Sequence, residues 1–108
     1  MILPIVVNMD GPAVIFGCGS VGMRKIELLS GYTDDIIAVS EEFQAMPPFV
    51  VRKKGTVTSR NIPDFIPKNA SLVVSALSDR ALNKSIADYC RANKILVNVV
   101  DDTELCTV

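Results

Sequence analysis

The sequence contains no histidine, and only 3 of its 108 residues are cysteines. The lack of histidine removes the commonest metal ligand and the commonest general base, so acid–base chemistry must fall to carboxylates, lysine, tyrosine or cysteine. Cys18, Cys90 and Cys106 are widely spaced and form no C-x-x-C pair, a pattern that is typical of reduced intracellular thiols. We therefore expect neither a disulfide framework nor a bound metal.

Long apolar runs and an excess of charge of one sign are also missing. No apolar run reaches the ~18 residues that a membrane helix requires, and the start at Met1 and Ile2 lacks the basic residues of a signal peptide. The 11 basic and 12 acidic residues give a net charge of −1, which indicates neither a nucleic-acid partner nor a membrane partner. These absences predict a cytoplasmic protein.

Short apolar runs alternate with amphipathic stretches along the chain, which predicts an α/β fold. With 108 residues, 49% of them hydrophobic, we expect one domain over residues 1–108. The fold class that fits is a Rossmann-type doubly wound, mostly parallel sheet with strand order 3-2-1-4-5 and an N-terminal edge strand, which carries Pro4. After that edge strand, the expected strands are residues 13–16, 36–40, 56–58, 70–76 and 95–100, with helices over residues 20–30 and from Ser78-Asp79 to about residue 93.

The segment between the second and third expected strands has two features of its own. Residues 41–46 are expected to form one or two helical turns before Pro47-Pro48 stops them. Residues 52–55 are a basic turn, which is either a solvated loop or a contact for an anionic substrate. The β-branched residues 56–58 then predict the third parallel strand at the edge of the sheet.

A glycine-rich turn, Gly17-Cys18-Gly19-Ser20-Val21-Gly22, lies between the first parallel strand and the first helix and has the G-x-G-x-x-G spacing. Gly17 would permit the tight turn, Gly19 would let a pyrophosphate approach the helix N-terminus, and Gly22 would let helix and strand pack closely. The turn predicts dinucleotide binding, with a merely structural turn as the alternative. Cys18 is either a thiol activated by the helix N-terminus or a small side chain packed beside the turn.

Ligands of open parallel sheets bind beyond the carboxyl ends of the strands, where the strand order reverses. An acidic residue about 20 positions after the glycines usually binds the ribose and favours NAD. Here Ser40 occupies that strand end and is followed by Glu41 and Glu42, so the acidic function is either displaced to the glutamates or replaced by the serine hydroxyl. The alternative, which is compatible with the first, is a helix N-terminus that Ser40 caps and whose dipole the glutamates complement. We expect Asp101-Asp102 to join this cluster, together with the following cofactor contacts: Gly17, Gly19, Ser20, Val21, Gly22, Ser40, Glu42, Phe43, Ala76, Ser78 and Asp79.

Three stretches, residues 17–25, 75–83 and 97–106, together resemble the precorrin-2 dehydrogenase / sirohydrochlorin ferrochelatase family, the NAD-dependent module of siroheme synthase. The last stretch, with Val97-Asn98-Val99-Val100-Asp101, is more specific than any glycine pattern. In that family the module oxidises the tetrapyrrole precorrin-2 to sirohydrochlorin with NAD, and many members also insert ferrous iron. The resemblance implies NAD as the cofactor and precorrin-2 as the substrate.

Residue by residue, the resemblance places the dinucleotide against Ser20-Val21 and Glu42-Phe43 and makes Asp101 the catalytic residue. The alternative for Asp101 is a turn or cap. Residues 77–79 read Leu-Ser-Asp where the family usually has Thr-Asp-Asp. Family members continue beyond the equivalent of Cys106 with a dimerisation segment and a helical domain that help to enclose the tetrapyrrole. The resemblance therefore implies a homodimer or a separate C-terminal domain protein as a partner.

Two other functions use a similar glycine turn. A nucleotide-sensing regulatory domain needs the turn but no catalytic carboxylate, and such domains usually carry an acidic residue where this chain has Ser40. A methyltransferase that uses S-adenosylmethionine would prefer G-x-G-x-G, a pattern that Val21 breaks. The sensor is the stronger of these two alternatives.

Overall fold

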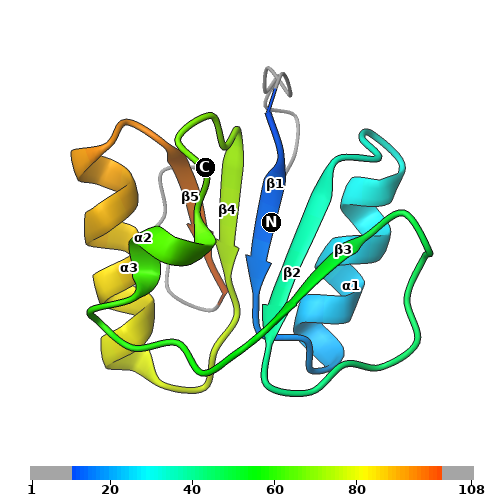
Figure 1. Ribbon diagram of the computed structural model, residues 1–108, viewed down its shortest axis with the longest axis horizontal. Coiled ribbons are helices and arrows are strands. Elements are labelled where there is room, and N and C mark those ends of the chain that lie inside the picture. Colours follow the sequence, from blue (N-terminus) through cyan, green and yellow to red (C-terminus); the bar gives the residue numbers. More distant parts are fainter. Residues whose placement is uncertain (1–10, 101–108) are drawn as a thin grey trace.

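A five-stranded, all-parallel sheet with the strand order β3-β2-β1-β4-β5 forms the centre of the molecule (Figure 1). The computed structural model describes residues 11–100, and within this range no helix is long and apolar enough to cross a bilayer. The predicted strand order is confirmed. The strands are β1 (Ala13–Phe16), β2 (Ile36–Ser40), β3 (Val51–Lys54), β4 (Leu72–Ser75) and β5 (Leu96–Val99), and the helices are α1 (Ser20–Ser30), α2 (Ile62–Phe65) and α3 (Arg80–Ala92).

The strand order reverses at β1, which pairs with β2 on one side and with β4 on the other. Phe16, the last residue of β1, is level with Val39 and Ser75. The carboxyl ends of the three central strands therefore meet at one edge of the sheet, which is where ligands of such sheets bind. The expected N-terminal edge strand lies in residues 1–10, outside the described residues.

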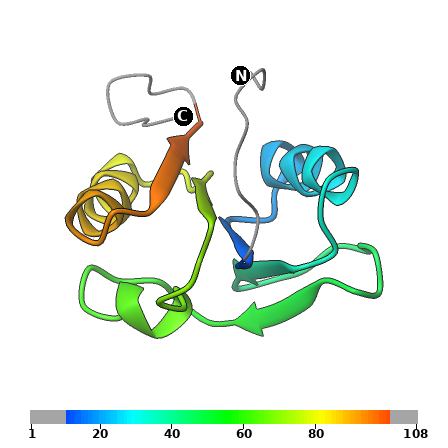
Figure 2. The ribbon, with the colours of Figure 1, turned by 90° about the horizontal axis from the view of Figure 1, so that it is seen from above.

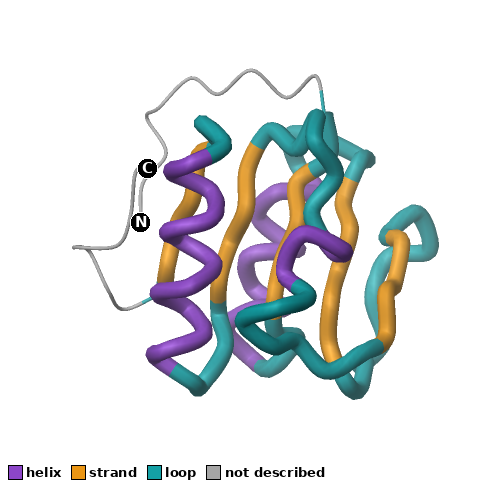
Figure 3. The backbone as a smooth tube through the Cα atoms, turned by 60° about the vertical axis from the view of Figure 1, so that its left-hand side comes forward, coloured by secondary structure: helices purple, strands orange, loops and turns teal. Residues whose placement is uncertain are grey.

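The two faces of the sheet are covered by different helices, as Figures 2 and 3 show. Ala13 and Ile15 of β1 belong to a core cluster with residues of α1, whereas Val14 and Phe16 belong to a second cluster with residues of α2 and α3. This alternation follows from the period of two along a strand. Both faces of β1 are buried, so its sequence is a continuous apolar run.

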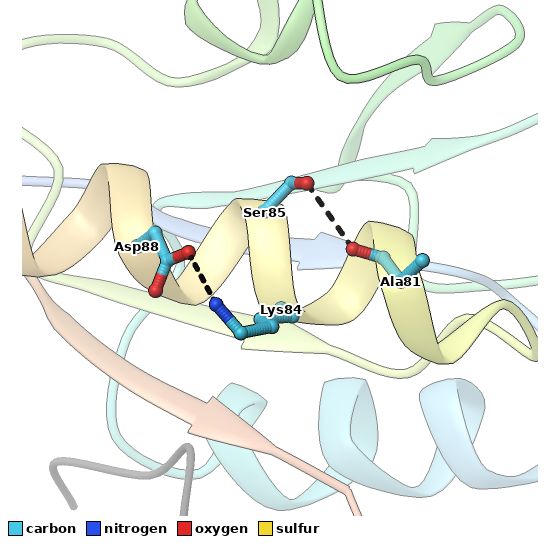
Figure 4. A network of polar contacts seen from close by, with 4 residues as sticks. All are labelled: Ala81, Lys84, Ser85 and Asp88. Carbon is cyan, nitrogen blue, oxygen red and sulfur yellow. Dashed lines mark hydrogen bonds and ion pairs between the residues drawn. The ribbon is translucent and has the colours of Figure 1, made fainter.

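On the solvent-exposed face of helix α3, side chains form polar contacts with other residues of the same helix (Figure 4). The Lys84 ammonium lies 3.0 Å from the Asp88 carboxylate, one helical turn away. Both side chains are more than half exposed, so this pair contributes only about 0.3–0.5 kcal/mol. The Ser85 hydroxyl donates to the carbonyl oxygen of Ala81 at 3.1 Å. The apolar face of α3, with Ile86 and the residues around it, faces the sheet instead.

Residues 41–46 are not helical, so the prediction of one or two helical turns is wrong. The Ser40 hydroxyl accepts a hydrogen bond from the Glu42 N–H at 3.4 Å, a local turn rather than the start of a helix. The Gln44 amide donates to the carbonyl oxygen of Cys18 at 3.2 Å. This long-range contact holds the segment against the glycine turn in an irregular conformation.

The third strand is the basic segment Val51–Lys54, so the prediction of a basic turn followed by a strand at residues 56–58 is also wrong. β3 is an edge strand with mostly exposed side chains, and charged residues are common on edge strands because they discourage pairing with other chains. The β-branched residues that follow lie in a loop, where the side chain of Val57 is buried in the core.

Candidate functional site

Gly17 begins the turn after β1, and its backbone adopts a conformation that glycine favours. Its φ is +92°, and a Cβ there would lie 2.7 Å from the carbonyl oxygen of Ala76. Its N–H donates to Val39 at 2.9 Å. The turn therefore fits closely between the end of β2 and the loop that follows β4, and the predicted reason for Gly17 is confirmed.

Positions 22 and 19 are occupied by glycine for different reasons. A Cβ on Gly22 would lie 1.8 Å from the carbonyl oxygen of Gly17, so Gly22 permits the predicted close packing of helix α1 on the turn. A Cβ on Gly19 would meet nothing within 4 Å, and the φ of Gly19 is an ordinary −74°. The fold thus has no internal need for glycine at position 19, and the space beside its Cα is open.

The N-termini of α1 and α3 differ in how their backbone N–H groups are satisfied. The first N–H groups of any α-helix lack partners within the helix and carry partial positive charge. At α3 the Asp79 carboxylate accepts from the N–H groups of Ala81 and Leu82, at 2.9 and 3.2 Å. At α1 the N-cap is Gly19, which has no side chain to do this, and the first turn holds no acidic residue. The α1 terminus therefore offers its N–H groups to an external anion.

The thiol of Cys18 is part of the hydrophobic core and not a reactive group. Cys18 is 5% exposed and belongs to the cluster between the sheet and α1. Burial raises the pKa of the Cys18 thiol, and a side-chain hydrogen bond with Ser40 only partly opposes this rise. The thiol is therefore protonated near neutral pH, and of the two alternatives for Cys18 the structure favours the small side chain packed beside the turn.

The end of β2 lies beside the glycine turn and carries the residues predicted to hold the ribose. Ser40 is half-buried and is level with Lys54 of the neighbouring strand β3. The side chains of Glu41 and Glu42 are exposed, whereas Phe43 packs against the cluster on the α1 side of the sheet. The structure thus brings Ser40 close to the turn and leaves both carboxylates in solvent.

The loop between β4 and α3 approaches the glycine turn from the other side. The Ala76 N–H donates to the carbonyl oxygen of Phe16 at 2.8 Å, which extends the β1–β4 ladder to the start of the loop. Ser78 and Asp79 are exposed, and Asp79 caps α3 where the sequence predicts that the helix starts. The glycine turn, the end of β2 and this loop therefore form one continuous edge.

Asp101, the predicted catalytic residue, lies outside the described residues. The preceding residue, Val100, donates its N–H to the carbonyl oxygen of Ser75 at 3.0 Å. The last described residue is thus fixed beside the end of β4, at the same edge of the sheet as the glycine turn.

Two polar side chains of this edge were not predicted from the sequence. Gln44 binds the carbonyl oxygen of Cys18, and no local pattern signals this contact. Asn83 is buried on α3 and binds the loop that follows β4. The sequence contains a signal for Asn83, because it is a polar residue at helical spacing from the buried Ile86, Ala87 and Cys90.

A parallel sheet with this strand order and an open, glycine-lined helix N-terminus at the point of reversal defines a Rossmann-type dinucleotide-binding domain. A family model described as putative NAD(P)-binding matches residues 5–108. The chain belongs to this NAD(P)-binding family.

Similar proteins agree with the resemblance read from the sequence. A precorrin-2 dehydrogenase from Methanosarcina barkeri is 36% identical over 107 residues, which are 92% of this chain and 48% of that protein. A siroheme synthase from Vesicomyosocius okutanii is 30% identical over 107 residues, which are 97% of this chain and 23% of that protein. The solved structure of SirC, a precorrin-2 dehydrogenase, superposes with a TM-score of 0.66 at 21% identity, over 91% of this chain and 49% of SirC. The chain thus spans about half, or less, of each of these proteins.

Proposed function

We propose that this chain is the NAD-binding module of a precorrin-2 dehydrogenase, which oxidises precorrin-2 to sirohydrochlorin. The observation that carries the proposal is the N-terminus of α1, where Gly19 leaves both the backbone donors and the space beside them open. A pyrophosphate fits such a terminus because its charge and oxygen acceptors match the free N–H groups. The names of the relatives supply the substrate.

In this proposal each part of the edge contacts a different part of the cofactor. The backbone of Ser20 and Val21 holds the pyrophosphate, while Ser40, Glu42 and Phe43 lie toward the adenosine. Ala76, Ser78 and Asp79 line the nicotinamide half. Bound NAD supplies a two-electron acceptor for the hydride that leaves the substrate.

The reaction also releases a proton, and we propose that Asp101 accepts it. A carboxylate is the natural choice in a chain without histidine. Position 101 directly follows Val100, whose N–H is bonded to the end of β4. An aspartate beside the nicotinamide could accept the proton as the hydride leaves.

The tetrapyrrole is large and anionic, and sites for such ligands bury most of the ligand surface. The relatives extend well beyond the region that matches this chain. We propose that further protein, from a second copy or a separate C-terminal domain, encloses the substrate. The reaction is proposed to occur in the cytoplasm, where the buried free thiols of Cys18 and Cys90 stay reduced.

The chain alone should oxidise precorrin-2 slowly with NAD. A separately expressed C-terminal domain should enclose the substrate and raise the rate. The test follows NADH formation with this chain, with and without the C-terminal half of the Methanosarcina relative expressed separately. A large gain in rate on adding that half is the expected result. Full activity of the chain alone would contradict the proposed need for enclosure, and no oxidation in either case would contradict the proposed substrate.

We expect NAD to bind more tightly than NADP, because Glu41 and Glu42 would repel a 2′-phosphate near Ser40. One pair of unit charges at 4 Å in water is worth about 1 kcal/mol, or roughly fivefold in affinity. Lys54, level with Ser40 on β3, is a cation that would oppose this preference. Calorimetric titrations of the wild-type chain and of Glu42→Gln test the expectation: the variant should bind NADP more tightly. Equal or reversed affinities in the wild-type chain would contradict it.

A further inference from the structure

A buried polar network joins the end of β4 to the first turns of α3. Ser75, the last residue of β4, is fully buried, and its hydroxyl donates to the Asn83 side-chain oxygen at 2.5 Å. Asn83 is 6% exposed and lies on the face of α3 that packs toward the sheet. Burial of two polar side chains costs free energy unless both are hydrogen-bonded, and these two satisfy each other.

Asn83 also binds both backbone groups of one residue in the loop before α3. Its side-chain oxygen accepts from the Leu77 N–H at 3.3 Å, and its side-chain nitrogen donates to the Leu77 carbonyl oxygen at 2.9 Å. The side-chain amide of Asn83 thereby pairs with the backbone N–H and carbonyl groups of Leu77, as the backbone of a neighbouring strand would. The conformation of residues 76–79 is thus fixed by Asn83 and not only by the ends of β4 and α3.

This loop contacts the glycine turn. The carbonyl oxygen of Ala76 lies so close to Gly17 that a Cβ on that glycine would be 2.7 Å away, and the side chain of Leu77 would be 3.4 Å from the same Cβ. The Ser75 carbonyl oxygen accepts from the Val100 N–H at 3.0 Å, beside the hydroxyl that binds Asn83. Asn83 therefore binds two residues of this edge, Leu77, which lies next to the glycine turn, and Ser75, which binds Val100.

From these contacts we propose that Asn83 is a positioning residue, which holds the loop of residues 76–79 in the conformation that accepts the dinucleotide. The inference rests on the proposed NAD binding, because the loop contacts the cofactor only in that proposal. Asn83 itself touches no reacting atom. It acts through Leu77 and through Ser75.

A matched variant elsewhere in the chain separates positioning from mere folding. Asn61 makes the same two kinds of bond in the loop after β3: its side chain accepts from the Thr58 N–H at 2.7 Å and donates to the Thr56 carbonyl oxygen at 2.8 Å. Replacing either asparagine by aspartate keeps the size and the acceptor but removes the donor to a carbonyl group. Ser75→Ala removes only the hydroxyl bond and serves as a milder second variant.

The experiment measures the NAD dissociation constant by calorimetry, together with the melting temperature, for the wild-type chain and for Asn83→Asp, Ser75→Ala and Asn61→Asp. Asn83→Asp should weaken NAD binding on the order of tenfold, as expected for about one hydrogen bond, and Ser75→Ala should weaken it less. Asn61→Asp should lower the melting temperature without changing NAD affinity.

The outcomes separate this inference from the proposed function. If the wild-type chain binds NAD but the folded Asn83→Asp and Ser75→Ala variants bind it equally well, the positioning role is wrong. An equal loss of affinity in Asn61→Asp would contradict the positioning role too, because the effect would then follow stability. If Asn83→Asp does not fold, Ser75→Ala alone decides the matter. A wild-type chain that does not bind NAD would overturn both the proposed function and the inference.

Discussion

Replacing Asp101 with alanine should reduce the oxidation of precorrin-2 on the order of 10²–10⁴-fold, the usual effect of removing a general acid or base. NAD affinity should barely change, because the proposed pyrophosphate contacts are backbone groups of the α1 N-terminus. The rate is measured in the assembly that is active, with the affinity and the melting temperature determined on the same variant. This combination isolates the chemical step from binding and folding.

The adjacent carboxylate provides the matched control for this prediction. Asp102→Ala removes an aspartate of the same charge from the next position, and we expect it to lower the rate far less than Asp101→Ala, because only Asp101 is proposed to accept the proton. If Asp101 instead forms a turn or cap, its replacement should lower the melting temperature and NAD affinity together. An unchanged rate in Asp101→Ala would exclude it as the catalytic base.

Replacing Gly19 with alanine should weaken NAD binding by roughly 10- to 100-fold, the cost of losing hydrogen bonds to a charged group. The added Cβ would meet no protein atom within 4 Å, so it would occupy the space proposed for the pyrophosphate. The change in the free energy of unfolding should be about 1 kcal/mol or less, because the backbone at Gly19 suits any residue. Calorimetry with NAD measures the first effect and thermal unfolding the second.

Gly22→Ala is the control with the opposite profile. Its Cβ would lie 1.8 Å from the Gly17 carbonyl oxygen, and such overpacking should destabilise the chain by about 2 kcal/mol or more. We therefore expect Gly19→Ala to be stable but to bind NAD poorly, and Gly22→Ala to be unstable. Tight NAD binding by a folded Gly19→Ala variant would show that the turn is structural only.

Most of the sheet could be predicted from the sequence because β1, β2 and β4 are almost entirely apolar and buried, and β5 is buried except at Leu96. Helix α3 was equally clear, since Asp79 caps it and its apolar residues recur at helical spacing. These signals are local, so a single sequence contains them. Gly17 and Gly22 were also assigned correctly, because their roles follow from the geometry of a strand–turn–helix unit.

The errors occurred where distant contacts decide the conformation. β3 has a charged sequence that suggests a turn, and only its place at the edge of the sheet makes a basic strand acceptable. Residues 41–46 have the composition of a helix, but Gln44 binds Cys18, 26 residues away. The contacts of Asn83 depend on the conformation of the loop of residues 76–79, and only its spacing with the buried residues of α3 is present in the sequence.

The central claim, that a dinucleotide binds at the N-terminus of α1, is tested most directly by titrating NAD into the isotope-labelled chain and following each backbone amide by NMR. The account predicts saturable shifts that are largest for the amides of residues 17–22, with smaller shifts in residues 40–43 and 76–79. The amide signals of α2, which lies on the opposite face of the sheet from α1, should not shift. Unchanged amides in residues 17–22 at saturating NAD, or shifts confined to another part of the chain, would contradict the account.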